Sequence, residues 1–158
     1  MSRTTGIGGW ERMFLRKAGP AFAGNAMTFF CRKGEKMPKF SKRSKKELAT
    51  AHPDLQRLFN EVIKTTDCAV VCGHRGRDDQ EKAFAEGFSR LRWPDSKHNK
   101  VPSLAVDVIP FPAGYSSVER FEELAAVVKE TAKRLKISVE WGGSWKRFVD
   151  RPHWQLPK

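Results

Sequence analysis

A carboxylate inside an apolar segment is the sequence feature that most constrains how this chain can fold. Segment 104–109 predicts a strand, and Pro110 ends it because proline has no N–H to donate to a sheet. Side chains alternate along a strand, so Asp107 shares a face with Ala105 and Ile109. Burying a carboxylate beside such neighbours is costly unless it has a partner. The fold must therefore bring a metal ion or an arginine to this strand from elsewhere in the chain.

Helical and extended patterns precede this strand. Pro53 opens a helix with an apolar residue at every helical turn, and Asp67 ends it. Its apolar face consists of Leu55, Leu58, Phe59, Val62 and Ile63. A short buried strand at 69–71 runs into a turn at 73–76, and a second helix follows. The residues expected to cap or pack this second helix are Asp78 or Asp79, Ala83, Phe84 and Phe88.

The second half of the chain predicts one long helix and two more strands. A loop at 89–103 contains His98, and Ser116 with Glu119 resembles a capping box that starts a helix reaching Lys136. The expected buried stripe of this helix is Val118, Phe121, Leu124, Ala125, Val128, Ala132 and Leu135. Strands are expected at 137–141 and 152–156, separated by a turn at Gly142 and a segment that packs Trp145 and Phe148. This order predicts a single α+β domain with a small, mostly antiparallel sheet flanked by helices.

Composition narrows the class of protein. A chain of 158 residues suits one domain, and 39% apolar residues argue for a folded protein. Nothing approaches 18 consecutive apolar residues, so we expect no transmembrane segment. The net charge of +12 attracts polyanions, which include nucleic acid, anionic lipid and an anionic cell-wall polymer. Charge alone does not choose among them.

Residues 1–36 differ from the rest of the chain. They carry seven Lys or Arg against two Glu and show no clear period. Three interpretations stay open: a poorly ordered basic leader, an extension upstream of a working start at Met37, or an export signal in 18–30 that glycines and Pro20 interrupt. We therefore expect the working domain to be 37–158, with the basic run 39–47 as a solvated entry to it.

The three cysteines carry no clear functional signal. Cys68 and Cys72 fall on one expected strand, about 13 Å apart at the usual rise per residue. That separation is too long for a disulfide, so we expect small buried side chains in a reducing compartment.

Two histidines and two carboxylates carry the chemistry. Taken singly, His98, Asp107 and His153 have ordinary structural explanations, and their spacing is not that of a compact helical zinc motif. Asp150, however, lies three residues before His153. Three such side chains with a water make a catalytic zinc site, and a nearby carboxylate can serve as its base.

Several segments together resemble one family. They are 72–76 with Gln80, 96–99, 102–110, and 141–145 with Phe148, Asp150 and 152–155. The chain resembles phage endolysins of the L-alanyl-D-glutamate peptidase type, which are related to D-alanyl-D-alanine carboxypeptidases of the VanY kind. The resemblance runs from about residue 38 to 157. It implies a hedgehog/D-Ala-D-Ala-peptidase-like fold and a zinc peptidase that cuts peptidoglycan stem peptides by attack of a zinc-bound water.

The resemblance also implies residue roles. The expected zinc ligands are His98, Asp107 and His153, the general base is Asp150, and Arg75 binds substrate or stabilises the oxyanion. Ser96 and Gln80 match motif positions at which supporting or substrate-contacting roles are expected. Apart from the resemblance, His74 beside Arg75 is either a substrate-contacting residue of the cleft wall or a plain turn residue. Glu140 could support a ligand histidine, but we expect a surface salt bridge. There are two departures from the family pattern. Asp150 replaces the Glu of many relatives, and the gap from His98 to Asp107 is two residues longer.

Two other functions stay open from the sequence. A D-alanyl-D-alanine carboxypeptidase is the alternative within the enzymes. A non-enzymatic basic nucleic-acid-binding module is the alternative from another class, but no nucleic-acid motif is present and we expect no nucleic-acid partner. We expect a bacteriolytic, monomeric hydrolase whose partner is peptidoglycan. Without a clear signal peptide, it would be made in the host cytoplasm and reach the wall after release.

Overall fold

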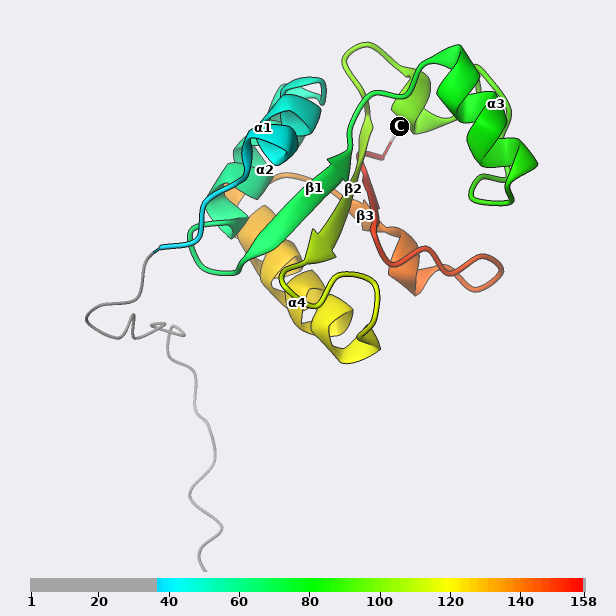
Figure 1. Cartoon of the computed structure of the whole chain (residues 1–158). Coiled ribbons are helices and arrows are strands. Elements are labelled where there is room, and N and C mark those ends of the chain that lie inside the picture. The colour runs from blue at the N-terminus through cyan, green and yellow to red at the C-terminus, as the bar shows by residue number, and fades with distance from the viewer. Residues whose placement is uncertain (1–36, 158) are drawn as a thin grey trace, which may run out of the picture. The chain divides into compact units, whose positions relative to one another are not determined.

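The computed structural model describes residues 37–157, so the three interpretations of 1–36 fall outside the described residues. Helices and strands alternate irregularly along the chain (Figure 1). In order they are α1 (Lys42–Ala49), α2 (Pro53–Val62), β1 (Cys68–Cys72), α3 (Arg77–Ala85), η1 (Lys97–Asn99), β2 (Ala105–Pro110), α4 (Val118–Leu135), β3 (Glu140–Trp141), η2 (Gly142–Ser144) and β4 (His153–Gln155). The two η elements are single turns of 3₁₀ helix.

One four-stranded sheet organises the domain. Its strand order is β1-β2-β4-β3, and each neighbouring pair is antiparallel. The predicted α+β domain with a small, mostly antiparallel sheet is therefore confirmed. The strand that carries Asp107 lies inside the sheet, between β1 and β4.

The hydrophobic core fills one face of this sheet. Val106 and Val108 of β2 are fully buried there, together with Cys68 and Val70 of β1. Helices α2 and α4 supply most of the remaining core, through residues that include Leu55, Leu58, Phe59, Val62, Phe121, Leu124, Ala125 and Val128. Because strand side chains alternate, Asp107 points to the opposite face. Figure 1 shows α3 on the other side of the sheet from α1 and α2.

The expectations about the helices needed three corrections. The Lys and Arg residues of the run 39–47 are exposed, as expected of a solvated entry, but the run also contains most of a helix that was not predicted. This helix, α1, buries Ser44 and Leu48 and is capped by Ser41. Helix α3 begins after Gly76 without a side-chain cap, and its buried residue is Gln80, whereas Phe88 is 73% exposed. The cap of α4 is Ser117, one residue later than expected, and Val118 is exposed.

No helix between residues 37 and 157 is long and apolar enough to cross a bilayer. Within the same residues Cys68 and Cys72 are free thiols. Cys68 is buried in the core as expected, but Cys72 is only partly buried and lies on the other face of the sheet. A register shift between Val70 and Cys72 explains the difference, because a bulge turns the following side chain over.

Candidate metal centre and active site

The sheet register brings two of the expected ligands face to face. Asp107 of β2 pairs directly with His153 of β4, and Cys72 of β1 is opposite Asp107 on its other side. Directly opposed residues on neighbouring strands project to the same face of a sheet. The register therefore places Asp107 and His153 together although 46 residues separate them in the sequence.

His98 reaches the same place from the turn η1. Ser96 caps this turn: its Oγ accepts from the His98 backbone N–H at 3.3 Å, and Asn99 Oδ1 accepts from the Ser96 N–H at 3.1 Å. The amide of Asn99 also donates to the backbone carbonyl of Arg75 at 3.0 Å. The His98 side chain is thus fixed between η1 and the turn after β1, and the residue is 2% exposed.

Three ligand atoms form an equilateral triangle. His98 Nε2, His153 Nδ1 and Asp107 Oδ1 are each 3.2 Å from the other two. Nitrogen and oxygen ligands lie about 2.0–2.1 Å from a tetrahedral zinc ion, which sets them about 3.3–3.4 Å apart. The spacing and the donor set therefore fit a single zinc ion with one open position.

Hydrogen bonds on the far side of each imidazole direct its lone pair into this triangle. His98 Nδ1 lies 2.7 Å from the carbonyl oxygen of Gly73, which can only accept, so Nδ1 carries a proton. His153 Nε2 lies 3.1 Å from Gln155 Oε1, and the Gln155 amide donates to Glu140. Glu140 thus acts on His153 through Gln155. Such partners are what metal-binding histidines use to fix their orientation.

Cys72 offers a second combination of ligands. Cys72, His98 and Asp107 could also hold a metal ion together. The Cys72 sulfur, however, lies 3.9 Å from His98 Nδ1, the ring nitrogen that is already hydrogen-bonded to the Gly73 carbonyl. We therefore favour His153 over Cys72 as the third ligand. The sequence pattern did not indicate this position of Cys72, because alternation from Val70 places it in the core.

The electrostatics of the triangle favour a positive charge at its centre. Burial lowers the pKa of His98, but the charge and hydrogen bond of Asp107 outweigh burial and raise it to about 10. Burial likewise raises the pKa of Asp107, yet the charge of His98 and the hydrogen bonds of both histidines hold it below its ordinary value. A site that holds a proton this strongly is one where a metal cation can take the proton's place.

Arg75 anchors the other oxygen of the Asp107 carboxylate. Its Nη2 lies 3.3 Å from Asp107 Oδ2, and the two side chains are only 17% and 16% exposed. Its Nη1 donates to Gln80 Oε1 at 3.4 Å, and the fully buried Gln80 donates in turn to Leu91 O at 2.6 Å and Ser89 Oγ at 2.9 Å. Gln80 therefore connects Arg75 to the loop after α3.

Asp150 lies in the loop before β4 and is held close to His153. The Asp150 N–H donates to the Gly142 carbonyl at 3.0 Å, and the Asp150 carbonyl accepts from the His153 N–H at 3.2 Å. A side chain at position 142 would place its Cβ 2.5 Å from the Asp150 carbonyl oxygen, so glycine is required there. Partial burial and the nearby Asp107 carboxylate raise the pKa of Asp150, and its neighbours His153, His98 and Arg75 partly oppose this rise.

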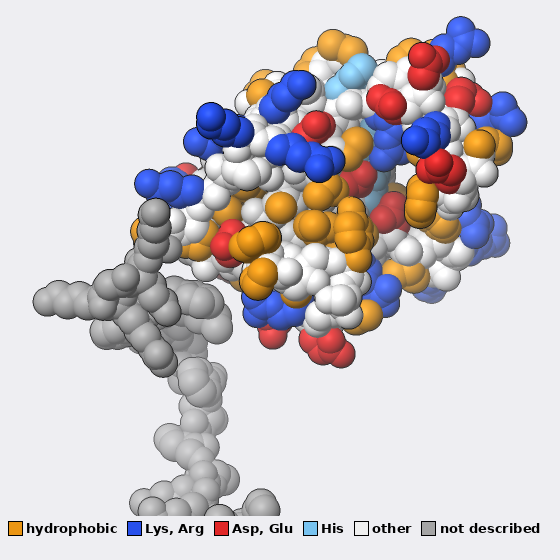
Figure 2. All heavy atoms as spheres, viewed as in Figure 1, with side chains coloured by type: hydrophobic (Ala, Val, Ile, Leu, Met, Phe, Trp, Pro, Cys, Tyr) orange, Lys and Arg blue, Asp and Glu red, His pale blue; other side chains and the backbone are white. Residues whose placement is uncertain are grey.

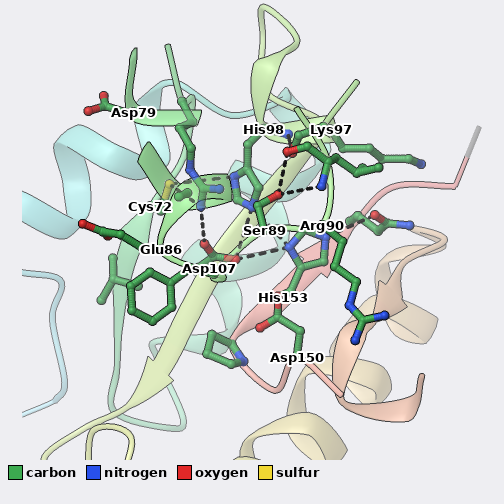
Figure 3. Close-up of a pocket in the computed structure, with 18 of the residues that line it drawn as sticks. Cys72, Asp79, Glu86, Ser89, Arg90, Lys97, His98, Asp107, Asp150 and His153 are labelled. Carbon is green, nitrogen blue, oxygen red and sulfur yellow. Dashed lines mark hydrogen bonds and ion pairs between the residues drawn. The ribbon is translucent and has the colours of Figure 1, made fainter. Parts of the chain in front are cut away.

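A cleft of about 720 Å³ is lined by the three proposed ligands, His98, Asp107 and His153, together with Arg75 and Asp150. Figure 3 shows Asp150 beside His153, with Asp107 and His98 pointing toward the same space. Figure 2 shows the hollow, which contains acidic and histidine side chains and is bordered by basic, acidic and hydrophobic ones. Ser96 and Gln155 also line the cleft, whereas His74 does not; its N–H donates to Thr50 Oγ1 at 2.7 Å.

Comparison with known proteins identifies the family. Residues 37–154 match the family model described as phage L-alanyl-D-glutamate peptidase. The chain belongs to this family. It is 30% identical over 117 residues to the L-alanyl-D-glutamate peptidase of Escherichia phage T5, a match that covers 71% of this chain and 85% of that protein. The resemblance seen in the sequence is thereby confirmed, and the chain is a peptidase.

A solved structure agrees with this family assignment. The crystal structure of the Serratia marcescens L-Ala D-Glu endopeptidase ChiX superposes with a TM-score of 0.65 at 31% identity. The match covers 76% of this chain and 91% of that one. Both the fold and the family thus agree with the expectation from the sequence.

Between His98 and Asp107 the chain of this phage-type peptidase forms an exposed loop. Residues 100–102 are all exposed, and Val101 is 84% exposed. Ser103 returns the chain to the fold, since its N–H donates to the Thr50 carbonyl at 2.9 Å and its Oγ donates to the Ala105 carbonyl at 2.7 Å. This loop therefore projects into solvent between two fixed ends.

Proposed function

We propose that this peptidase is a zinc-dependent endolysin that hydrolyses the L-alanyl-D-glutamate bond of peptidoglycan stem peptides. The observation that carries the proposal is the 3.2 Å triangle of His98 Nε2, His153 Nδ1 and Asp107 Oδ1 at the wall of a cleft. In a chain of this family, such a triangle supports a catalytic metal site rather than a structural one, because all three residues line an open cleft that a substrate could enter.

His98, Asp107 and His153 would hold the zinc ion. When bound, zinc supplies Lewis acidity, which activates a water molecule and polarises the peptide carbonyl. Arg75 orients Asp107 by binding its Oδ2, which turns Oδ1 toward the two histidines. The Arg75 guanidinium also adds positive charge beside the carbonyl oxygen that becomes negative in the transition state.

Asp150 would act as the general base. It would take the proton of the attacking water and later give it to the leaving nitrogen. Its raised pKa supports both steps, because a catalytic acid–base works best when its pKa is near the working pH. Asp150 has one methylene fewer than the Glu of many relatives, and Gly142 allows its loop to approach His153 closely.

Ser96 and Gln80 would act as positioning residues. Ser96 caps the turn that carries His98, and Gln80 joins Arg75 to the loop that forms the cleft wall. Neither would need to touch the reacting atoms. His74 is not among the residues that line the cleft, and we propose no catalytic role for it.

The charge of the chain suits an anionic substrate. A net charge of +12 favours approach to a wall polymer that carries carboxylates and phosphates. We propose that the enzyme acts on the wall after release from the host cytoplasm. Peptidoglycan would then be its only macromolecular partner, and the enzyme would act as a monomer.

Digestion of purified peptidoglycan tests this proposal. Mass spectrometry should find fragments with new amino-terminal glutamate, activity should vanish with a chelator, and zinc should restore it. Release of terminal D-alanine instead would favour the carboxypeptidase. Asp150→Ala should keep stoichiometric zinc and lose nearly all lysis, whereas Asp107→Ala should lose zinc. Near wild-type lysis by Asp150→Ala would refute the assigned base.

A further inference from the structure

Five basic side chains line the cleft, and three of them are already engaged. Arg75 pairs with Asp107, Lys97 donates to the backbone carbonyl of Leu156, and Lys82 lies 4.0 Å from Glu86. The other two are Arg43 and Arg90. Within residues 37–157, neither of these guanidinium groups has a hydrogen bond or a carboxylate partner. They are therefore available to a ligand.

Arg90 is held on the side of the cleft where Asp150 lies. Its guanidinium carbon is 4.7 Å from the ring centroid of Phe148, which is two residues before Asp150 in the same loop. Arg90, Asp150 and His153 all line the same cleft, where Figure 3 labels them. Arg43, in contrast, belongs to α1, which packs on β1 at the opposite edge of the sheet from the β3–β4 loop.

The chemistry of the substrate demands a cation near Asp150. This step rests on the proposed function. The leaving nitrogen of an L-alanyl-D-glutamate bond belongs to the glutamate, and Asp150 is the group that protonates it. Glutamate has two carboxyl groups, and at most one of them can continue the chain. A free carboxylate therefore lies within a few bonds of the leaving nitrogen, where it would repel the Asp150 carboxylate unless a cation intervened.

We propose that Arg90 binds the free carboxylate of the glutamyl residue and so selects the residue on the leaving side of the cleaved bond. A guanidinium presents two parallel N–H donors that match the two oxygens of a carboxylate. The Phe148 ring orients the guanidinium before substrate arrives, which reduces the conformational entropy lost on binding. Arg90 is thus a specificity-determining residue, separate from the groups that hold metal or transfer protons.

Two synthetic stem peptides test the proposal. One carries the free glutamyl carboxylate and the other a carboxamide at the same carbon, which is neutral and of similar shape. The wild-type enzyme should prefer the carboxylate by about 10- to 100-fold in kcat/KM, the usual strength of a charge-assisted pair. Arg90→Gln should remove this preference by losing activity on the carboxylate peptide alone. Arg90→Lys should keep part of the preference, because the positive charge remains while the two parallel N–H donors of the guanidinium are lost.

Arg43→Gln is the matched control. This variant removes one positive charge from the same cleft. If the cleft only attracts anions in general, Arg43→Gln and Arg90→Gln should lose the preference for the carboxylate peptide equally. That result, or an Arg90→Gln enzyme with the wild-type preference, would overturn the role of Arg90. Cleavage of neither peptide by wild-type enzyme would instead overturn the proposed function, and with it the premise of this assignment.

Discussion

Substitution of Gly142 by alanine should damage the site while leaving the core intact. The added Cβ would lie 2.5 Å from the Asp150 carbonyl oxygen, 3.0 Å from His153 Cβ and 3.2 Å from Asp150 Cβ. All three neighbours belong to the proposed base and to a proposed zinc ligand. None is the far end of a flexible side chain, so the backbone of the loop must move.

The expected magnitude follows from these distances. A carbon and an oxygen without a bond between them approach to about 3.2–3.4 Å, so the Asp150 carbonyl must retreat by roughly 0.7–0.9 Å. Overpacking of this kind costs about 1–3 kcal/mol of stability. A displacement of about 1 Å in a catalytic group can cost about 100-fold in rate. Zinc affinity should also fall, because the His153 N–H donates a hydrogen bond to the Asp150 carbonyl, which must move.

Three measurements on one preparation check this. Urea unfolding gives the stability, competition with a chelating dye gives the zinc affinity, and release of fragments from peptidoglycan gives kcat/KM. The control is Gly76→Ala, since nothing lies within 4 Å of an added Cβ there and φ is −69°. A Gly142→Ala enzyme with wild-type stability, zinc affinity and kcat/KM would show that the close approach is not a constraint.

Three further outcomes are expected. Burial lowers the pKa of His98, but Asp107 outweighs burial and raises this pKa to about 10. Protonated His98 therefore stabilises the metal-free protein fully below the ordinary pKa of 6.5, and this stabilisation is lost as pH rises through 10. Urea unfolding of chelated protein should show this decline in stability, and added zinc should abolish the decline. Gln80→Ala should lower the free energy of unfolding by about 2–4 kcal/mol, because it opens a cavity and leaves buried groups without hydrogen-bond partners. As a control, replacing the exposed Asp78 of the same helix by alanine should change this free energy by less than about 0.5 kcal/mol. Gly76→Ser should stabilise the protein by about 0.5–1 kcal/mol, because α3 lacks a side-chain cap and the position is open, and thermal unfolding measures the gain.

Local patterns predicted the elements whose signal is local. The apolar period of α2 and α4 and the short apolar strands were located within a few residues, because each pattern reports one buried face. Helix α1 was missed since four of its eight residues are Lys or Arg, which hides the two buried positions, Ser44 and Leu48. Phe88 was misplaced in the core because helix spacing says nothing about where the helix ends, and α3 stops at Ala85.

The convergence of the site could not be derived from spacing. His98 and His153 are 55 residues apart, and only the register of β2 on β4 and the bonds of η1 to the turn after β1 bring them together. A slip of one residue in that register would send Asp107 to the core face. Family resemblance indicated the grouping, whereas the bulge that turns Cys72 into the cleft carried no sequence signal that alternation could reveal.

The two halves of the proposed chemistry rest on different parts of the fold. The triangle is built from paired strands and a capped turn, whose atoms are fixed by hydrogen bonds on both sides. Asp150, Phe148 and Arg90 come from loops that border the cleft. Changes to the loop residues should therefore alter kcat/KM and specificity while zinc affinity stays constant. Gly142 is the exception, because its neighbours belong to both halves, and this is why its substitution should lower zinc affinity and rate together.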